Sequence, residues 1–348
     1  MNILILAGGL SPEREVSFTS GCRIATALIG RGHRVCLCDP YTGCDPDGKP
    51  PVYTADAIHP RRIGMKVPDL ATLKRESGRG ERRIAPGVME LCRTAEVVFI
   101  ALHGDIGEDG RLQAMLETEG IRHTGSGYAG CLLAMDKDIA KRLFREADIL
   151  TPDWVHCDLS RQTAEATAAH IEETVGYPCV VKPCSCGSSV GVSMAEDREE
   201  LMQALTLAMQ YEGDIIAERR IQGREVTVSV LGGRVLPAVE IVPHEGFYDY
   251  ANKYQAGAVE ELCPARIALA EASALADAAR RGFDVLRLGG YARFDFILDK
   301  TGTAWCLEAN ALPGMTPTSL LPRAAAAIGM DYPSLCEEIL RLATGIPE

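Results

Sequence analysis

The sequence lacks a long hydrophobic run. Its N-terminal apolar segment covers only six residues, Ile3 to Gly8, and no basic residue precedes it. A secretory signal peptide needs a basic start and a longer apolar stretch, and a membrane-spanning helix needs about 20 mostly apolar residues. We therefore expect a cytoplasmic protein with no membrane-inserted segment.

An excess of positive charge is missing as well. The chain carries 36 lysines and arginines against 48 aspartates and glutamates, which gives a formal net charge of −12. Such a protein has no general electrostatic attraction to nucleic acid or to an anionic membrane surface. We expect neither of these partners, and any small anionic ligand must be held by local donors.

Zinc-binding cysteine patterns are also absent. The thirteen cysteines include no C-x2-C pair, and no histidines follow at a matching spacing. Most of them are expected to be buried thiols of a reducing compartment. Cys184 and Cys186 lie one residue apart in KPCSCGSSVG, residues 182–191. This stretch leaves two interpretations open: a metal or redox site, or a loop that wraps a phosphate.

The sequence does contain the alternation of strand and helix that is typical of an α/β fold. With 348 residues, 47% of them hydrophobic, the chain is long enough for two or three globular domains. Strands predicted at about 2–7, 33–38 and 96–102 indicate a first domain with a parallel sheet. Residues 42–90 are rich in Pro, Gly and Arg, and we expect them to form an irregular, peripheral excursion.

The rest of the chain continues this alternation. Helices are expected at about 12–29, 111–119, 136–147, 161–175, 196–210 and 266–286. Further strands are expected at about 178–183, 214–218, 224–231, 234–241, 290–299 and 303–310. Junctions near residues 122 and 218 divide the chain into three domains, namely 1–122, 123–218 and 219–348.

Two strands near the C-terminus, GGYARFDFILD and TAWCLEANALPG, predict a hairpin that turns at Thr301 and Gly302. A two-residue turn places Asp295 opposite Glu308 and Arg293 opposite Asn310, with all four side chains on one face. The other, apolar face then carries Phe294, Phe296, Leu307 and Ala309.

Two carboxylates that face each other repel, and they raise each other's pKa unless a cation lies between them. One interpretation is a structural ion pair in which Arg293 neutralises the acids. The other is a magnesium site, because Asp295, Glu308 and the Asn310 carbonyl would present three hard oxygen ligands. We favour magnesium held together with phosphate, with Arg293 beside it to meet developing negative charge.

Phosphate donors are expected in the loop after the strand that ends at Lys182. Its glycines and serines can present several backbone N–H groups to an anion, although no GK[ST] follows and the loop is not a Walker A motif. Lys137 in MDKDIAK could supply a second charge, although a solvated helix lysine is the ordinary alternative. Near the N-terminus, Ser11 is predicted to cap a helix, and Glu13 then lies in the first turn, where the helix dipole alone favours a carboxylate.

Together these segments resemble the ATP-grasp D-alanine:D-alanine ligases of peptidoglycan synthesis. The resemblance is carried, in the family's order, by GGLSPEREVSFTSG at 8–21, LHGDIGEDGRLQ at 102–113, MDKDIAK at 135–141, VVKPCSCGSSVGVS at 180–193, GREVTV at 223–228, FYDYANKY at 247–254, ARFDF at 292–296 and EANALPGMTPTSL at 308–320. It spans nearly the whole chain and implies a three-domain ATP-grasp architecture.

The resemblance implies a ligation in two steps. The carboxylate of a first D-alanine attacks the γ-phosphate of ATP to give an acylphosphate, and the amine of a second D-alanine displaces phosphate through a tetrahedral intermediate. ATP is then a co-substrate, and Mg²⁺, in two copies and replaceable by Mn²⁺, is the expected metal. A homodimer is the oligomeric state that the family suggests.

The resemblance also assigns roles to single residues. Asp295, Glu308 and Asn310 match the magnesium ligands, and Lys137 and Lys182 match phosphate-binding lysines. The loop 184–193 covers the triphosphate, with backbone donors from Gly187, Ser188 and Ser189. Glu218 and Glu225 match the acids that hold adenine and ribose. Arg293 and the N–H of Gly314 match the groups that stabilise the oxyanion.

The substrates have their own matching residues. Glu13, Ser188 and Tyr254 match a hydrogen-bonded set that orients the first substrate's ammonium, so Glu13 changes from a structural residue to a functional one. His103 matches the histidine near the first substrate. The pocket for the second substrate's carboxylate is matched by Lys253, Ser319 and the N–H of Leu320.

The chain departs from the family pattern at two places. Ala311 follows Asn310 where relatives often have threonine, and the loop cysteines Cys184 and Cys186 are unusual. Neither change removes a metal ligand or a phosphate donor, so we treat the two thiols as incidental. Two alternatives remain: a ligase that uses D-serine or D-lactate as the second substrate, and an ATP-binding regulator that has lost catalysis.

Overall fold

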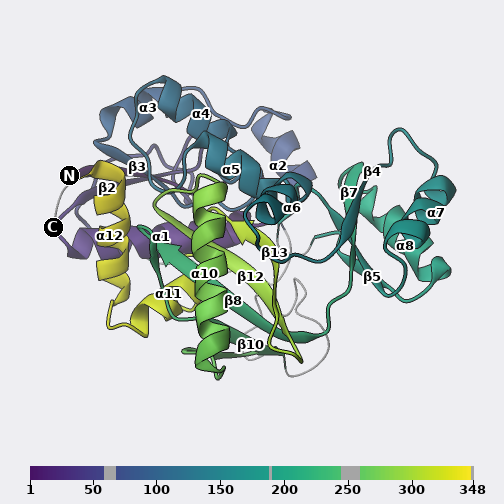
Figure 1. Cartoon of the computed structure of the whole chain (residues 1–348). Coiled ribbons are helices and arrows are strands. Elements are labelled where there is room, and N and C mark those ends of the chain that lie inside the picture. The colour runs from purple at the N-terminus through teal and green to yellow at the C-terminus, as the bar shows by residue number, and fades with distance from the viewer. Residues whose placement is uncertain (59–67, 188–189, 244–258, 346–348) are drawn as a thin grey trace.

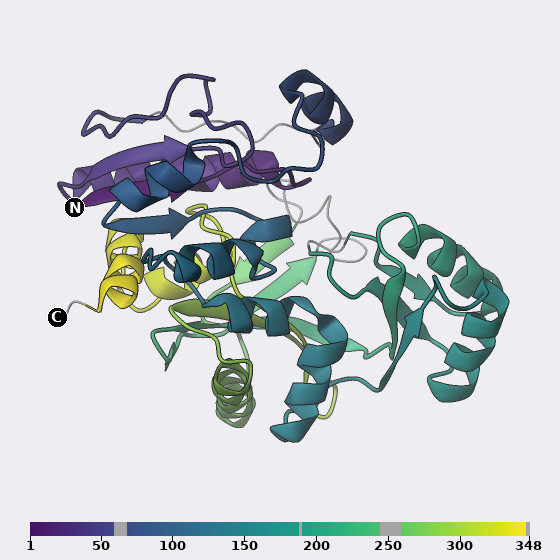
Figure 2. The same cartoon turned by 90° about the horizontal axis from the view of Figure 1, so that it is seen from above.

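The computed structural model describes residues 1–58, 68–187, 190–243 and 259–345. These residues form three β-sheets with helices packed against them (Figure 1). In Figure 2 the smallest lobe, drawn in teal, stands to one side of the rest of the molecule. Within the described ranges, no helix is long and apolar enough to cross a membrane.

The first sheet is parallel, as the sequence predicted. Its strand order is β2-β1-β3, from β1 (Asn2–Leu6), β2 (Arg34–Cys38) and β3 (Val97–Ile100). Strands this apolar are expected where helices cover both faces of a sheet. The covering elements include α1 (Arg14–Gly30), α3 (Val88–Thr94), α4 (Arg111–Thr118) and, from the far end of the chain, α12 (Tyr332–Thr344).

The second sheet is small and antiparallel. Its order is β4-β7-β5-β6, from β4 (Trp154–Asp158), β7 (Asp214–Arg219), β5 (Cys179–Pro183) and β6 (Ser193–Ala195). The helices α7 (Ala164–Thr174) and α8 (Arg198–Ala208) cover one face and share its apolar core. Strand β5 lies between β7 and β6 and ends at Pro183, so the loop that follows leaves from the end of an inner strand.

The third sheet is antiparallel and has β8 and β12 at its centre. Its order is β11-β10-β8-β12-β13, with β9 added beside β8, from β8 (Gly223–Leu231), β9 (Arg234–Val235), β10 (Val239–Pro243), β11 (Val259–Leu262), β12 (Tyr291–Asp299) and β13 (Ala304–Asn310). The long helix α10 (Leu269–Val285) packs on its apolar face.

Two further helices, α5 (Tyr128–Met135) and α6 (Lys137–Glu146), also belong to the core of the third sheet. Phe144 of α6 packs against Phe294 of β12 with ring centroids 6.4 Å apart. These helices precede the second sheet in the sequence but pack with the third in space. The domain boundaries at 122 and 218 stay predictions.

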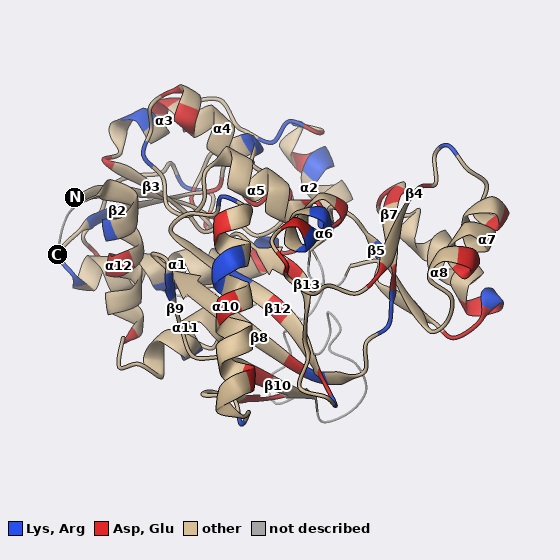
Figure 3. Cartoon of the chain, in the orientation of Figure 1, with Lys and Arg blue, Asp and Glu red and all other residues tan. Residues whose placement is uncertain are grey.

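Several elements differ from the sequence prediction. The excursion 42–90 is not wholly irregular, because it contains α2 (Leu70–Ser77) and the start of α3. Strand β4 and helix α5 were not predicted, and the strand expected at 234–241 is split into β9 and β10. Figure 3 shows acidic and basic residues interspersed along the elements in that view.

Candidate active site

The hairpin of β12 and β13 brings together the residues expected to bind metal. Arg293 pairs with Asn310, and Asp295 pairs with Glu308, as predicted. The side chains of Arg293 and Asp295 are largely buried, and the side chain of Glu308 is 27% exposed. The polar face of the hairpin is therefore formed by the four residues that the sequence indicated.

The turn of this hairpin was predicted wrongly. Asp299 N donates to the Thr303 carbonyl at 3.0 Å, so three residues rather than two connect the strands, with Gly302 at φ +81°. Cys306, not Leu307, therefore lies opposite Phe296 and joins the apolar core. Leu307 is the extra residue of a β-bulge, and this bulge restores the predicted pairing at Asp295.

The carboxylate of Asp295 has three donors around it. Arg293 donates to both of its oxygens at 2.8 Å, and Asn310 Nδ2 donates to Oδ2 at 3.0 Å. Glu308 lies 3.4 Å from the ammonium of Lys137. The repulsion expected between the two opposed acids is thus offset by two cations, and the structural ion pair is formed.

The same residues fit magnesium. Asp295 and Glu308 face each other on one surface, and Asn310 adds an amide oxygen to a set of hard donors. Within the described ranges, no cluster of three or more His, Cys, Asp or Glu side chains is arranged as a metal site. A magnesium ion at the hairpin would have two carboxylates and one amide oxygen as protein ligands, which would leave ligand positions for phosphate oxygens.

Glu218 is a buried acid between two lysines. Lys141 Nζ lies 2.8 Å from one carboxylate oxygen, and Lys182 Nζ is paired with the other. Burial by itself raises the pKa of Glu218, but the two lysines outweigh it and lower the pKa to about 2. Glu218, Glu308 and Glu225 also surround Lys182 electrostatically and raise its pKa despite burial. Lys182 is therefore a fixed positive charge within reach of three acids.

Lys141 was not predicted as a site residue. It is fully buried, donates to Thr151 Oγ1 at 2.5 Å and lies over the ring of Trp154. The signal was present in MDKDIAK, because Lys141 follows Lys137 by four residues and both therefore point from one face of α6.

The loop that is expected to bind phosphate, residues 184–193, begins beside α6. Lys137 N donates to the Cys184 carbonyl at 3.1 Å, and Lys137 Nζ donates to the Cys186 carbonyl at 2.8 Å. Both hydrogen bonds are accepted by backbone carbonyl groups of the cysteines, and the thiols take no part in them. Ser188 and Ser189 lie outside the described residues. Because Lys137 contacts both Cys186 and Glu308, it connects this loop to the carboxylate on β13.

The environment of the two loop thiols does not favour the thiolate form. Both are free; burial raises the pKa of Cys184 and, with Glu212, of Cys186, so the reactive thiolate is disfavoured. We expect a Cys184→Ala, Cys186→Ala double variant to keep its kcat/KM within about twofold, because the contacts to Lys137 are made by the backbone. Initial-rate measurements check this, and metal-dependent loss of folding in the variant would contradict it.

On the N-terminal side, His103 lies among two acids and a serine. Its Nδ1 is 3.7 Å from Glu108 Oε1, and its Nε2 is 3.3 Å from Ser20 Oγ. Burial lowers the pKa of His103, but Glu108 and Glu13 outweigh this and raise it above the ordinary value. Burial and the charge of Glu13 raise the pKa of Glu108. The three groups therefore form one polar cluster around the buried His103.

Glu13 faces the phosphate loop. A methyl group at Gly187 would lie 3.7 Å from Glu13 Oε2 and 3.9 Å from Glu108 Oε2, which places the loop against both acids. Glu13 is not in the first turn of α1 but at its N-cap, because the helix begins at Arg14. Ser11 does not cap the helix with its side chain; its Oγ accepts a hydrogen bond from Glu13 N at 3.1 Å.

Glu108 was not assigned a role from the sequence. It follows His103 by five residues in LHGDIGEDG, a segment that was recognised as a whole. The left-handed backbone at Gly104 and Asp105 folds this segment back, so that the acid reaches the histidine. That turn is the feature that sequence reasoning missed.

The expected pocket for the second substrate is described in part. Ser319 is the N-cap of α11 (Leu320–Ala326), and its Oγ accepts from Thr316 N at 3.1 Å. A methyl group at Gly314 would meet that Oγ at 2.9 Å, so the two expected residues are neighbours. Lys253 and Tyr254 lie outside the described residues. Ala311 is buried in the core of the third sheet, where its methyl group packs.

Two family descriptions match this chain. The one described as "D-ala D-ala ligase N-terminus" covers residues 2–126, and "D-ala D-ala ligase C-terminus" covers residues 143–341. Among curated proteins, the D-alanine–D-alanine ligase of Nitratidesulfovibrio vulgaris (strain Hildenborough) is 39% identical over 98% of both chains. That of Anaeromyxobacter sp. (strain Fw109-5) is 40% identical over 97% of this chain and 95% of its own.

Solved structures of ligases from this family resemble the chain over nearly its whole length. The D-alanine–D-alanine ligase of Bacillus anthracis matches with a TM-score of 0.77 and 27% identity over 99% of this chain and 98% of that chain. A structure of the same enzyme complexed with ATP matches with a TM-score of 0.75 and 24% identity over the same shares. The expected ATP-grasp architecture is thereby confirmed. The chain belongs to the D-alanine–D-alanine ligase family.

Proposed function

We propose a division of labour among the residues of this ligase, which joins two D-alanines at the cost of ATP through an acylphosphate and a tetrahedral intermediate. The observation that carries it is the hairpin register, which puts Asp295 opposite Glu308 with Lys137 3.4 Å from the latter. Such a set positions and neutralises a phosphoryl group, which is most of what phosphoryl transfer requires of a protein.

The nucleotide lies between the second and third sheets in this proposal. Lys137 and Lys182 bind phosphate oxygens, and N–H groups of Gly187, Ser188 and Ser189 close over them. Glu218 accepts from the adenine amino group and Glu225 holds the ribose. The support is electrostatic, since Lys182 already has Glu218, Glu225 and Glu308 around it.

Magnesium, in two copies and replaceable by manganese, would be held by Asp295, Glu308 and Asn310. When bound, it supplies positive charge to the phosphate oxygens. Asn310 orients Asp295 through its amide nitrogen, and Arg293 holds both oxygens of that acid in place. Arg293 is thereby positioned, together with the N–H of Gly314, to stabilise the oxyanion of the tetrahedral intermediate.

The first D-alanine is placed beside His103, with its ammonium oriented by Glu13, Ser188 and Tyr254. The closeness of Glu13 and Gly187 supports a contact between the phosphate loop and this substrate. The second D-alanine binds through its carboxylate to Lys253, Ser319 and the N–H of Leu320. We further propose that the chain works as a cytoplasmic homodimer.

The choice of second substrate is tested by phosphate release with ATP, D-alanine and each candidate acceptor. We expect D-alanine to be used in preference to D-serine and D-lactate, because FYDYANKY carries the tyrosine and lysine of an amino-acid acceptor loop. This segment lies entirely outside the described residues. A clear preference for D-serine or D-lactate would replace this assignment. No phosphate release with any acceptor would favour an ATP-binding regulator, against which the retained Lys137, Lys182 and Asp295 argue.

A further inference from the structure

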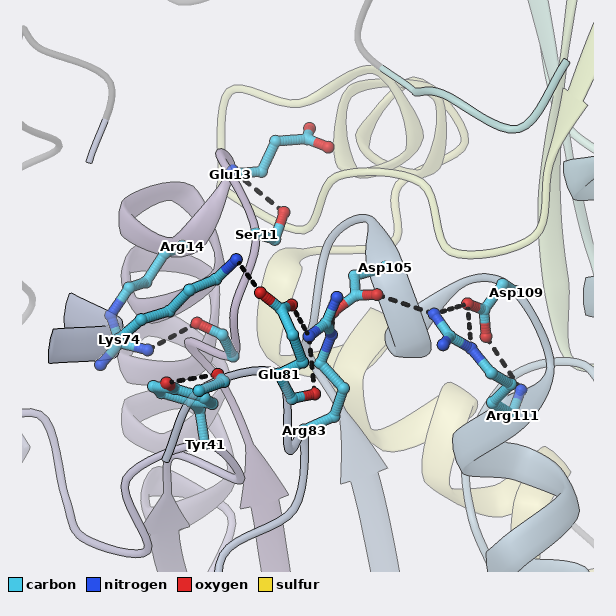
Figure 4. A network of polar contacts seen from close by, with 12 residues as sticks. Ser11, Glu13, Arg14, Tyr41, Lys74, Glu81, Arg83, Asp105, Asp109 and Arg111 are labelled. Atoms are coloured by element: carbon cyan, nitrogen blue, oxygen red, sulfur yellow. Dashed lines mark hydrogen bonds and ion pairs between the residues drawn. The ribbon is translucent and has the colours of Figure 1, made fainter. Parts of the chain in front are cut away.

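The excursion between β2 and α3 reaches the turn that carries His103. Arg83, which follows α2, is paired through Nε with one carboxylate oxygen of Asp105. Arg111, at the start of α4, donates to the other oxygen at 2.8 Å. Figure 4 shows Asp105 between these two arginines. The side chain of Asp105 is only 16% exposed, so the contact is partly shielded from water.

Asp105 has an unusual backbone conformation. Its φ is +48°, in the left-handed region that costs a non-glycine residue about 1 kcal/mol or more, although aspartate tolerates it better than most residues. Its carbonyl accepts from Glu108 N at 3.1 Å and from Asp109 N at 3.2 Å. The strained residue therefore closes the turn between His103 and Glu108.

This turn sets the spacing within the polar cluster of His103, Glu108 and Glu13. A methyl group at Gly104 would lie 3.2 Å from Glu13 Oε2 and 2.9 Å from Ser11 Oγ, so the backbone of the turn already touches the start of α1. His103 and Glu108 stand at the two ends of the turn, 3.7 Å apart at their nearest charged atoms. A shift of Asp105 would change the position of both.

We propose that Arg83 is a positioning residue: by holding Asp105 it fixes the turn from His103 to Glu108 and thereby the site of the first D-alanine. The inference rests on the proposed role of His103. Arg83 also lies 3.0 Å from Glu81, which is bonded at 2.5 Å to Lys74 of α2. Residues 42–90, which the sequence predicts to be peripheral, are thus connected through Arg83 to the turn that carries His103.

The ordinary alternative is a surface ion pair that contributes only about 0–1 kcal/mol to stability. A stabilising ion pair and a positioning contact predict different effects of removing Arg83. A stability contribution lowers the melting temperature and leaves the substrate constants of the folded enzyme alone. A positioning contribution alters the constant for the first D-alanine in an enzyme that melts normally, because small misplacements at a reacting centre are costly.

The test uses Arg83→Met and Asp105→Asn in the full chain, since asparagine also tolerates the left-handed backbone. Initial rates are fitted with separate KM values for ATP and the two D-alanines. We expect the KM of the first D-alanine to rise about tenfold, with the KM of ATP within about twofold. The double variant should be no worse than Asp105→Asn alone, because Asp105→Asn already weakens the contact that Arg83→Met removes. Arg83→Lys should recover part of the loss.

Arg93→Met is the matched control, because Arg93 forms an exposed pair with Glu119 in the same part of the molecule, 2.9 Å apart. If Arg83→Met behaves like this control, or if it raises every KM together with a lower melting temperature, the inference is wrong. His103→Ala separates the two proposals. If His103→Ala leaves the KM of the first D-alanine unchanged, the proposed role of His103 is wrong. If His103→Ala raises this KM and Arg83→Met does not, only the positioning role of Arg83 is wrong.

Discussion

Replacing Arg293 with alanine is expected to abolish ADP release driven by D-alanine, with kcat lower by about a thousandfold. Two losses combine in this variant. The guanidinium that would meet the oxyanion is gone, and Asp295 loses the two hydrogen bonds of 2.8 Å that hold it. Asp295→Asn should have a similar effect, because it removes a carboxylate from the expected metal ligands. The measurement is D-alanine-dependent ADP formation at saturating ATP.

Arg224→Ala is the control for this prediction. Arg224 makes a comparable two-pronged contact with Glu240 on the same sheet, at 2.7 and 2.6 Å, and has no proposed role in the reaction. It should turn over at a rate close to that of the unchanged enzyme. Circular dichroism should show that all three variants are folded. Normal turnover by both Arg293→Ala and Asp295→Asn would mean that the site is misplaced.

Replacing Lys141 with methionine is expected to lower the free energy of unfolding by about 3 kcal/mol. Lys141 is fully buried and pairs with Glu218, whose side chain is only 2% exposed. In the variant, the buried carboxylate of Glu218 loses its contact with Lys141 and keeps the contact with Lys182. Removing one member of a buried pair is costly because the other charge stays out of water. Urea-induced unfolding of the variant and the unchanged enzyme measures the difference.

This loss should depend on pH in a defined direction. The pKa of Glu218 is lowered from 4.5 to about 2 in the folded enzyme, so its contribution to stability is present above pH 4.5 and is lost as the pH falls through about 2. The unfolding curves of the two proteins should therefore converge over that range. Arg145→Met, which removes an exposed pair on the same helix, should cost no more than about 1 kcal/mol. An equal loss at pH 7 and pH 2 would contradict the role of Glu218.

The pairing of β12 with β13 could be predicted because side chains alternate between the two faces of a strand and because a short turn containing glycine sets which residues lie opposite each other. The prediction of Asp295 opposite Glu308 was right although the turn was one residue longer, because the bulge at Leu307 compensates. A bulge depends on how both strands pack on their neighbours. The sequence of the hairpin alone does not contain that information, and the assignment of Leu307 to the apolar face failed for this reason.

The sequence did not predict Glu108 and Lys141 as site residues, and the reason is different. Each becomes significant through a partner that folding brings close: His103 across a left-handed turn, and Glu218 from 77 residues further along the chain. Local patterns identify strands, helices and glycine-rich loops, but they do not report which buried charges meet. The family resemblance supplied the residues that its motifs contain, and it did not extend to the contacts between them.

The packing of α12 on the first sheet has a consequence for synthesis of the chain. Leu335, Cys336 and Ile339 of this helix lie in the same apolar core as Ile3 and Val97, and His33 contacts Glu337 at 3.0 Å. Strands that are synthesised early therefore obtain part of their core from residues that are synthesised much later. Until α12 has been synthesised, part of the apolar surface of the first sheet is uncovered, and we expect the nascent sheet to be prone to aggregation unless a chaperone covers this surface.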